Sequence, residues 1–167
     1  TRVVVLVHGG FWRKIYGLGL MDPLAADLVG RGVAVWNIEY RRLGGGGGWP
    51  ETFDDVSAAI EALPLDASRV VAIGHSAGGH LAVWAAAQGL VDAAVSQAGA
   101  LDLDELSRLG TSDNVVNQLL AGTPEEMERE VLAALASDSP QERDRRREFA
   151  REQTWAHRVE ALVPAVE

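Results

Sequence analysis

Residues 69–87 read RVVAIGHSAGGHLAVWAAA, and this stretch decides the fold. Its first five residues form a β-branched run typical of a buried strand, whereas the part from residue 79 onward is rich in helix formers. Between them, residues 74–78 have the form Gly-x-Ser-x-Gly. A strand that leads through a tight turn into a helix puts Ser76 at the apex, with its hydroxyl projecting above the sheet. Gly74 and Gly78 are expected there because a Cβ would collide with the neighbouring strand or helix.

This context predicts a nucleophile elbow, in which the Ser76 hydroxyl attacks a substrate carbonyl. The alternative interpretation is a serine that only caps the helix after it. His75 occupies the variable position of the motif and is expected beside the serine, in the substrate pocket. His80 lies one helical turn after Ser76, and we expect it to be a buried or capping histidine.

A second motif lies near the start of the chain, where the apolar run 3–7 leads into HGGFW at residues 8–12. Acyl transfer needs hydrogen-bond donors at the point where negative charge develops on the attacked carbonyl oxygen. One such donor is the main-chain N–H directly after the serine, here Ala77. A glycine-rich loop after an earlier strand supplies the others, here Gly9 and Gly10, because glycine lets the backbone approach the substrate. These three residues are the predicted oxyanion hole.

The other residues of the second motif have predicted roles around this site. Phe11 and Trp12 are expected to line the substrate pocket, although a tryptophan at this place is also compatible with simple loop packing. His8 is expected to brace the oxyanion loop. The glycine run at residues 44–48 follows the second predicted strand and is expected to be a flexible loop at the rim of the site.

The chain resembles the α/β-hydrolase superfamily of esterases and lipases, and within it the kynurenine formamidase-like branch. The matching residues are HGGFW at 8–12 and GHSAGGHLA at 74–82, with EYRRL at 39–43, WP at 49–50 and DDV at 54–56 between them. The resemblance covers about residues 3–140. It implies hydrolysis of a carboxylic ester or an aryl formamide by a serine hydrolase, and it implies a three-layer α/β/α sandwich around a mostly parallel sheet.

The order of apolar runs and helical patterns agrees with an α/β fold that lacks some terminal strands. Parallel strands with right-handed crossovers are expected from the alternation of short buried strands with helices. We predict a hydrolase core over residues 1–140 and a charged helical tail over residues 141–167. The predicted strands are 3–7, 33–38, 69–73 and 93–97, and the predicted helices are 18–30, 51–62, 77–88, 114–121, 124–136 and 141–162.

A serine nucleophile needs a base and an orienting acid, which follow it in the order acid, then histidine. His157 is the only histidine beyond the predicted helix that follows Ser76, and Asp138 and Asp144 are candidate acids. No motif supports His157 as the base, and an exposed helical histidine is the competing interpretation. Asp102 is expected to cap a helix.

After Pro140 the sequence becomes rich in charge where the family has another buried strand. Two hypotheses account for this change: a genuine replacement of the family's last strands, or a truncation or altered reading frame.

Composition and net charge limit the partners and the chemistry that we expect. The chain has 167 residues, a net charge of −9 and no cysteine, so we expect no nucleic-acid partner and no thiol chemistry. We expect no cofactor, no metal and no membrane partner, and a cytoplasmic location by default.

The unpaired edges of a shortened sheet predict association between copies. Besides a serine hydrolase, the sequence is compatible with a non-catalytic binding domain of the same fold, or with a site whose base comes from a second subunit.

Overall fold

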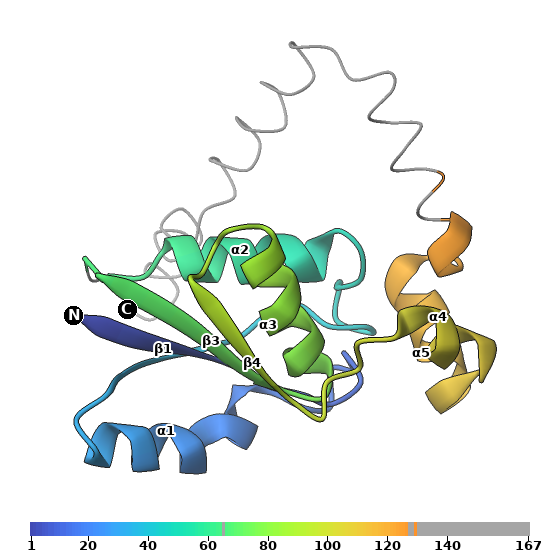
Figure 1. Ribbon diagram of the computed structural model, residues 1–167. Helices are drawn as coiled ribbons and strands as arrows, with labels where there is room; N and C mark the ends of the chain where they lie inside the picture. Colours follow the sequence, from blue (N-terminus) through green and yellow to red (C-terminus); the bar gives the residue numbers. More distant parts are fainter. Residues whose placement is uncertain (65, 127–128, 130–167) are drawn as a thin grey trace, which may run out of the picture.

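The computed structural model describes residues 1–64, 66–126 and 129, and its centre is one parallel β-sheet (Figure 1). The sheet has four strands in the order β2-β1-β3-β4, and every neighbouring pair is parallel. The predicted strands are confirmed to within two residues at each end. Their bounds are Arg2–Val7 for β1, Ala34–Ile38 for β2, Arg69–His75 for β3 and Ala93–Gln97 for β4.

Helices cover both faces of this sheet, so the predicted α/β class is confirmed. Helix α1 lies on one face, while α2 and α3 lie on the other (Figure 1). Helices α4 and α5 lie near the carboxyl ends of the strands. The bounds are Leu18–Met21 for the 3-10 helix η1, Asp22–Gly30 for α1, Glu51–Glu61 for α2, Ala77–Ala87 for α3, Leu103–Arg108 for α4 and Thr111–Leu120 for α5.

The strand order creates a switch point between β1 and β3. The chain leaves β1 through α1 toward β2 on one side, and it leaves β3 through α3 toward β4 on the other. The loops after these two neighbouring strands therefore diverge to opposite faces of the sheet. In open α/β sheets, ligands bind in the crevice that such diverging loops leave at the carboxyl ends of the strands.

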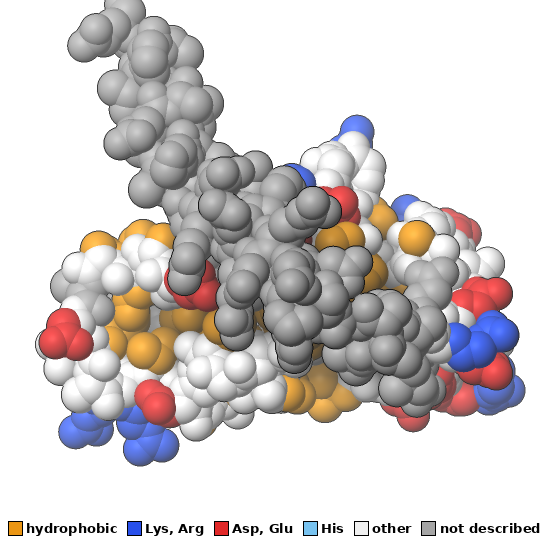
Figure 2. Space-filling view, turned by 90° about the horizontal axis from the view of Figure 1, so that it is seen from above, with side chains coloured by type: hydrophobic (Ala, Val, Ile, Leu, Met, Phe, Trp, Pro, Cys, Tyr) orange, Lys and Arg blue, Asp and Glu red, His pale blue; other side chains and the backbone are white. Residues whose placement is uncertain are grey.

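The hydrophobic core lies between the sheet and the two helices α2 and α3. Val5 and Val7 of β1 are fully buried, as are Val56 of α2 and Leu81 of α3. Helix α5 contributes Val115, Val116 and Leu119 to the same cluster. On the face shown in Figure 2, apolar side chains are visible at several separate places, and Lys, Arg, Asp and Glu side chains gather at the right-hand end. None of the helices in the described part of the chain is long and apolar enough to span a bilayer.

Two helices differ from the prediction. Helix α4 was not predicted, because its six residues bury no side chain and so leave no apolar periodicity to detect. The prediction that Asp102 caps a helix is nevertheless confirmed, since its carboxylate accepts a hydrogen bond of 2.8 Å from Glu105 N. Helix α5 begins three residues before the predicted start, but Ser112, Asp113 and Asn114 have positive φ values there.

Near the end of the described residues, the predicted helix 124–136 begins as expected. Thr123 Oγ1 accepts from Glu126 N at 3.2 Å, and the Glu126 carboxylate accepts from Thr123 N at 2.7 Å. This reciprocal pair is a capping box. The remainder of that helix apart from residue 129, the predicted helix 141–162 and the charged tail lie outside the described residues.

The glycine run 44–48 forms hydrogen-bonded turns rather than the free loop expected from its composition. The main-chain N–H groups of Gly45 and Gly47 both donate to Arg42 O, at 2.8 and 3.0 Å. Gly48 N donates to Thr52 Oγ1 at 3.0 Å, and a Cβ on Gly47 would lie 2.3 Å from the carbonyl of Arg41. Glycine is therefore required here because the chain folds back on its own backbone.

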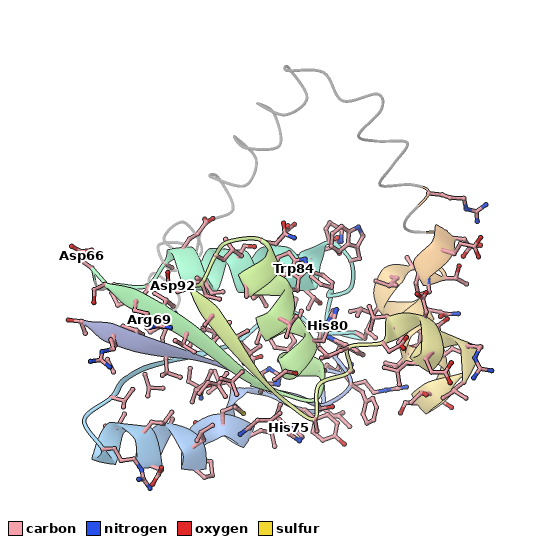
Figure 3. All side chains as sticks on the ribbon, in the orientation of Figure 1. Asp66, Arg69, His75, His80, Trp84 and Asp92 are labelled. Carbon is pink, nitrogen blue, oxygen red and sulfur yellow. The ribbon has the colours of Figure 1, made fainter. Side chains whose placement is uncertain are left out.

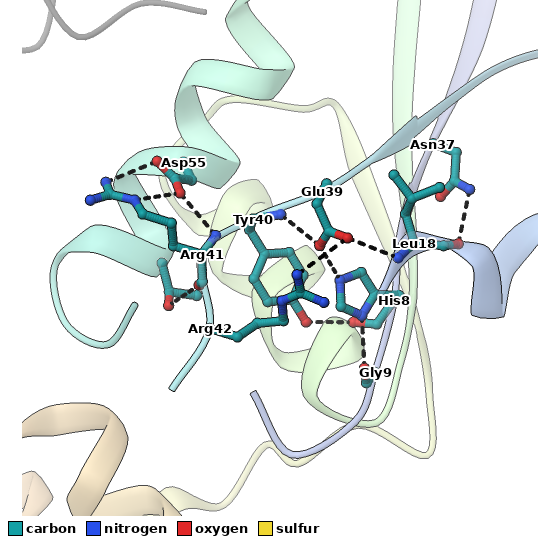
Figure 4. Close-up of polar contacts among 10 residues, drawn as sticks. His8, Gly9, Leu18, Asn37, Glu39, Tyr40, Arg41, Arg42 and Asp55 are labelled. Carbon is teal, nitrogen blue, oxygen red and sulfur yellow. Dashed lines mark hydrogen bonds and ion pairs between the residues drawn. The ribbon is translucent and has the colours of Figure 1, made fainter. Parts of the chain in front are cut away.

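A paired charge joins this loop to α2. The Asp55 carboxylate accepts from Arg41 Nε at 2.7 Å, from the Arg41 terminal guanidinium nitrogen at 2.9 Å, and from Arg41 N at 2.9 Å (Figure 4). Asp55 is only 7% exposed, so the pair is shielded from water on the carboxylate side. A bidentate pair of this kind fixes geometry as well as adding energy. It holds the segment after β2 against the first turns of α2.

We expect Asp55→Asn to lower the free energy of unfolding by about 1–3 kcal/mol, because the amide cannot accept all of these hydrogen bonds. Urea denaturation at neutral pH measures the change. The control is Asp54→Asn, at the exposed neighbouring residue, which we expect to stay within about 0.5 kcal/mol of the parent. Equal effects of the two substitutions would contradict this role of Asp55.

Candidate functional site

Ser76 lies at the turn between β3 and α3, in a backbone conformation that serine rarely adopts. Its φ is 52° and its ψ is −117°. The turn is held from β4 and from the loop after it, because Ser76 N donates to Gln97 O at 2.9 Å and Ala100 N donates to Ser76 O at 3.2 Å. The serine side chain makes no capping hydrogen bond to α3, which contradicts the interpretation of Ser76 as a simple helix cap. The hydroxyl is thus left available above the sheet, partly exposed.

The glycines of the turn are required by close backbone contacts, as predicted. A Cβ on Gly74 would lie 2.0 Å from Gly78 O, at the start of the helix. A Cβ on Gly78 would lie 2.1 Å from Val7 O, at the end of β1. Real Cβ atoms do not approach backbone this closely. The helix N-terminus can therefore lie directly against the end of β1 only because both positions are glycine.

The loop after β1 lies beside the serine. Val7 pairs with Gly74 in the parallel register, so two residues further on Gly9 comes opposite Ser76. A Cβ on Gly9 would lie 3.2 Å from Ser76 Cβ and 2.6 Å from His75 O. The two motifs that the sequence separates by more than sixty residues are thus in contact at the switch point.

The predicted oxyanion residues gather at this contact. Among the main-chain hydrogen bonds of the described residues, none is donated by Gly9, Gly10 or Ala77. The Ala77 amide belongs to the first turn of α3, where helix N–H groups have no partner within the helix and carry partial positive charge. Such free amides beside a serine hydroxyl can bind a developing negative charge.

The predicted oxyanion loop, residues 8–12, has a strained backbone. Gly10, Phe11 and Trp12 have φ values of 113°, 52° and 53°. Positive φ is uncommon for residues with a side chain, and it persists only where the surrounding structure enforces it. One restraint is the hydrogen bond of 2.9 Å from Arg13 N to Gly10 O. Another is the side chain of Tyr16, which would overlap any Cβ on Gly10.

His8 braces the loop from below through a buried polar cluster, in line with its predicted role (Figure 4). Its ring is fully buried, with Nδ1 2.8 Å from Gly9 O and Nε2 2.7 Å from Glu39 Oε1. Tyr40 stacks on the ring at a centroid distance of 4.3 Å, and its hydroxyl donates to His8 O at 2.7 Å. Burial raises the pKa of Tyr40, and the charge of Glu39 raises it further, so this hydroxyl keeps its proton.

Glu39 and Tyr40 had no predicted role, although both belong to the segment 39–43 that carries the family resemblance. Their position directly after the second predicted strand could have indicated this role. Glu39 directly follows β2 and therefore lies at the carboxyl edge of the sheet, where the neighbouring strand β1 is followed by His8. Parallel pairing of β1 and β2 could have predicted this contact.

His80 and Trp12 lie in an aromatic cluster under the loop. Their rings meet edge to face at 5.6 Å, and Phe53 contacts His80 at 5.8 Å and Trp84 at 5.0 Å. Trp12 is 1% exposed and belongs to the hydrophobic core, so its position is one of packing, and a contact with substrate stays a prediction. Burial lowers the pKa of His80 to about 4. His80 is therefore neutral at pH 7 within this aromatic cluster.

The other predicted pocket residues lie at the surface. His75 is exposed where β3 leads into α3, whereas His80 and Trp84 lie further along α3 (Figure 3). Phe11 is 40% exposed on the oxyanion loop. The role of these two residues in a substrate pocket stays a prediction.

The base and the acid of a triad are not among these contacts. No side chain in the described part of the chain hydrogen-bonds to the Ser76 hydroxyl. Asp102 caps α4, and His157, Asp138 and Asp144 lie outside the described residues. Within residues 1–64, 66–126 and 129, no group of acidic residues and histidines could hold a metal ion. The described site therefore consists of a serine, free amides and their support.

We expect Gly78→Ala to lower the free energy of unfolding by about 3 kcal/mol or more, since its methyl group would overlap the backbone at the end of β1. Chemical denaturation measures the loss. Gly30→Ala is the matched control, because a Cβ there meets nothing within 4 Å. Alanine near the end of α1 should be neutral or slightly stabilising. Similar behaviour of the two variants would argue against the close contact.

The lowered pKa of His80 predicts a pH-dependent stability. The unfolded chain binds a proton near pH 6.5 and the folded chain only near pH 4, so stability falls as the pH drops through this window. The expected loss between pH 7 and pH 5 is about 2 kcal/mol. His80→Gln should remove that part of the pH dependence in urea titrations, whereas His75→Gln, at the exposed histidine, should retain it.

Comparison with known proteins gives this site its context. The BD-FAE family model matches residues 1–117. None of the curated proteins compared with the chain matches it. Among solved structures, a bifunctional GH43-CE protein of Bacteroides eggerthii is 26% identical with a TM-score of 0.64, over 74% of this chain and 22% of that one.

Two further solved structures are similar over nearly three quarters of this chain. A bacterial heroin esterase is 25% identical with a TM-score of 0.56, over 73% of this chain and 45% of its own. A hormone-sensitive lipase from a metagenome library is 23% identical with a TM-score of 0.54, over 73% and 48%, and supports the fold alone. The chain thus spans less than half the length of each of these proteins. Because the family model covers well over half of it, the chain belongs to the BD-FAE family and has the α/β-hydrolase fold.

Proposed function

We propose that this chain carries the nucleophile and the oxyanion hole of a serine esterase. The observation that supports this most strongly is the position of Ser76, at a strained turn with Gly9 directly beside it. The esterase named among the similar structures supports ester hydrolysis. Ser76 is the proposed nucleophile, in a nucleophile elbow formed by residues 74–78.

The proposed reaction follows from this arrangement. The Ser76 oxygen attacks the carbonyl carbon of the ester while a base takes the hydroxyl proton. The N–H groups of Gly9, Gly10 and Ala77 stabilise the negative charge on the carbonyl oxygen of the tetrahedral intermediate. The intermediate collapses when the alcohol leaves with that proton, and an acyl group remains on Ser76. Water then attacks the acyl group in the same way and releases the carboxylic acid.

No side chain of the described residues contacts the Ser76 hydroxyl as the base of this reaction. His157 remains our candidate, as the one histidine of the sequence beyond α3. A base donated by a second subunit is the other arrangement we propose to test, and ester turnover per subunit that rises with protein concentration would support it. Phe11, exposed on the loop after β1, and His75, exposed directly before Ser76, are the proposed contacts for the acyl or leaving group.

The substrate class has two candidates that share one mechanism. A carboxylic ester is favoured by the esterase among the similar structures. An aryl formamide is favoured by the sequence resemblance to the kynurenine formamidase-like branch. Both present a carbonyl carbon to Ser76 and an oxyanion to the same amides. Competition between the two substrates for one site would distinguish a shared pocket from a selective one.

A binding domain without catalysis is the second candidate function. It is favoured by one observation, that no described side chain hydrogen-bonds to the Ser76 hydroxyl. In that case the free amides of the oxyanion loop would bind a carboxylate or carbonyl group of a ligand without attack by the serine.

Labelling with a fluorophosphonate probe tests the proposed function. We expect one probe per chain by intact mass, because these probes react with an activated serine and not merely with an exposed one. Ser76→Ala should abolish the label, and Ser68→Ala, at an exposed serine of another loop, should keep it. His157→Ala should slow labelling if His157 is the base.

Failure to label well-folded protein would contradict the esterase proposal and favour the binding domain. Fold integrity in that experiment is checked by circular dichroism and by a cooperative urea transition.

A further inference from the structure

We propose that Glu39 holds His8 as a doubly protonated imidazolium, and that His8 and Tyr40 position the two peptide groups whose N–H bonds form the oxyanion hole. The positioning role rests on the proposed function. The protonation state of His8 does not, because it follows from the hydrogen-bond partners of the ring alone. Glu39, His8 and Tyr40 act through the loop and do not contact the reacting atoms.

Both ring nitrogens of His8 face hydrogen-bond acceptors. Nδ1 is 2.8 Å from Gly9 O, and a carbonyl oxygen can only accept. Nε2 is 2.7 Å from Glu39 Oε1. A neutral imidazole carries one proton and could serve only one of these partners, unless the Glu39 carboxyl group carried the other proton. The protonation state of Glu39 therefore decides that of His8.

The surroundings of Glu39 favour the ionised carboxylate. Oε1 also accepts from Tyr40 N at 3.0 Å, while Oε2 accepts from Leu18 N at 3.1 Å and lies 3.5 Å from an Arg42 guanidinium nitrogen. Burial by itself raises the pKa of Glu39, but the hydrogen bonds from His8, Tyr40 and Leu18 outweigh it and lower the pKa to about 2. With an ionised Glu39, the proton between the two side chains belongs to His8.

Peptide geometry transmits this arrangement to the oxyanion hole. In a trans peptide the C=O of one residue and the N–H of the next point in opposite directions from one plane. His8 Nδ1 holds Gly9 O, and therefore fixes the direction of the Gly10 N–H. The Tyr40 hydroxyl holds His8 O at 2.7 Å, and therefore fixes the direction of the Gly9 N–H. Each predicted loop donor thus has its own restraint on the carbonyl side.

The positive charge on His8 also strengthens the hydrogen bonds that orient the loop. A charge-assisted hydrogen bond is roughly twice as strong as a neutral one, and the His8 ring is fully buried, so solvent does not screen it. Hydrogen bonds in series polarise one another, and donation to Gly9 O makes the Gly10 N–H a stronger donor. The stacked Tyr40 ring, tilted by only 8° from His8, keeps the imidazole in the plane that reaches both partners.

The protonation state is tested by nitrogen-15 NMR of the histidine-labelled chain at neutral pH. The spectrum distinguishes a ring with two N–H groups from either neutral tautomer. We expect His8 to carry protons on both nitrogens in the parent chain, and Glu39→Gln to leave only the Nδ1 proton. A single protonated nitrogen on His8 in the folded parent would overturn the proposal, whatever the activity of the chain.

The positioning role is tested by the amide resonances of the loop and by labelling rates. Glu39→Gln should shift the Gly10 amide resonance, and Tyr40→Phe, which keeps the stacked ring, should shift that of Gly9. We expect Glu39→Gln to slow fluorophosphonate labelling about tenfold, which corresponds to about 1.4 kcal/mol. The control is Glu105→Gln, which removes the charge from an exposed ion pair with Arg108 and should change neither measurement.

These outcomes separate the two proposals. Unchanged Gly9 and Gly10 amides in the folded variants would overturn the positioning role. A labelling rate for Glu39→Gln equal to that of Glu105→Gln would do the same. If the parent chain does not label at all, the esterase proposal fails, and the NMR measurements alone decide whether Glu39 sets the state of His8 and of the loop amides.

Discussion

The contact on which the site depends is the one between the start of α3 and the end of β1, where no side chain intervenes. Gly78 lies so close to the carbonyl of Val7 that even a methyl group would overlap it. This approach brings the first turn of the helix, with its free N–H groups, over the end of the strand. It also fixes the distance between Ser76 and the glycine loop that continues from β1. A looser packing would separate the serine from the amides beside it.

Topology decides why this contact lies where ligands can reach it. Strands β1 and β3 are neighbours in the sheet, yet their following helices lie on opposite faces. The loops diverge above the sheet and leave the serine turn open between them. From the other side, β4 and the loop after it hold the turn through hydrogen bonds to and from Ser76. The site is therefore held by three parallel strands, while the hydroxyl itself is left free of hydrogen bonds within the described residues.

Two histidines near the site illustrate how surroundings set chemical state. His8 lies among a carboxylate, a carbonyl oxygen and a tyrosine ring, an environment that accepts protons and favours positive charge. His80 lies among aromatic rings, which offer no carboxylate, and burial lowers its pKa to about 4. Both rings support the same loop, since His8 binds Gly9 O and His80 packs on Trp12. One supports it through charge and the other through packing.

The sequence by itself determined the α/β class, the four strands and the turn at Ser76. It could do so because buried strands, helix formers and glycines at fixed spacing are local signals. It also determined the cap at Asp102, for the same reason. Only the tertiary structure decided that Glu39 and Tyr40 support the loop, because these residues reach His8 across two paired strands. It also decided that Trp12 packs in the core and His75 lies at the surface, since the burial of a side chain depends on elements that are distant in sequence.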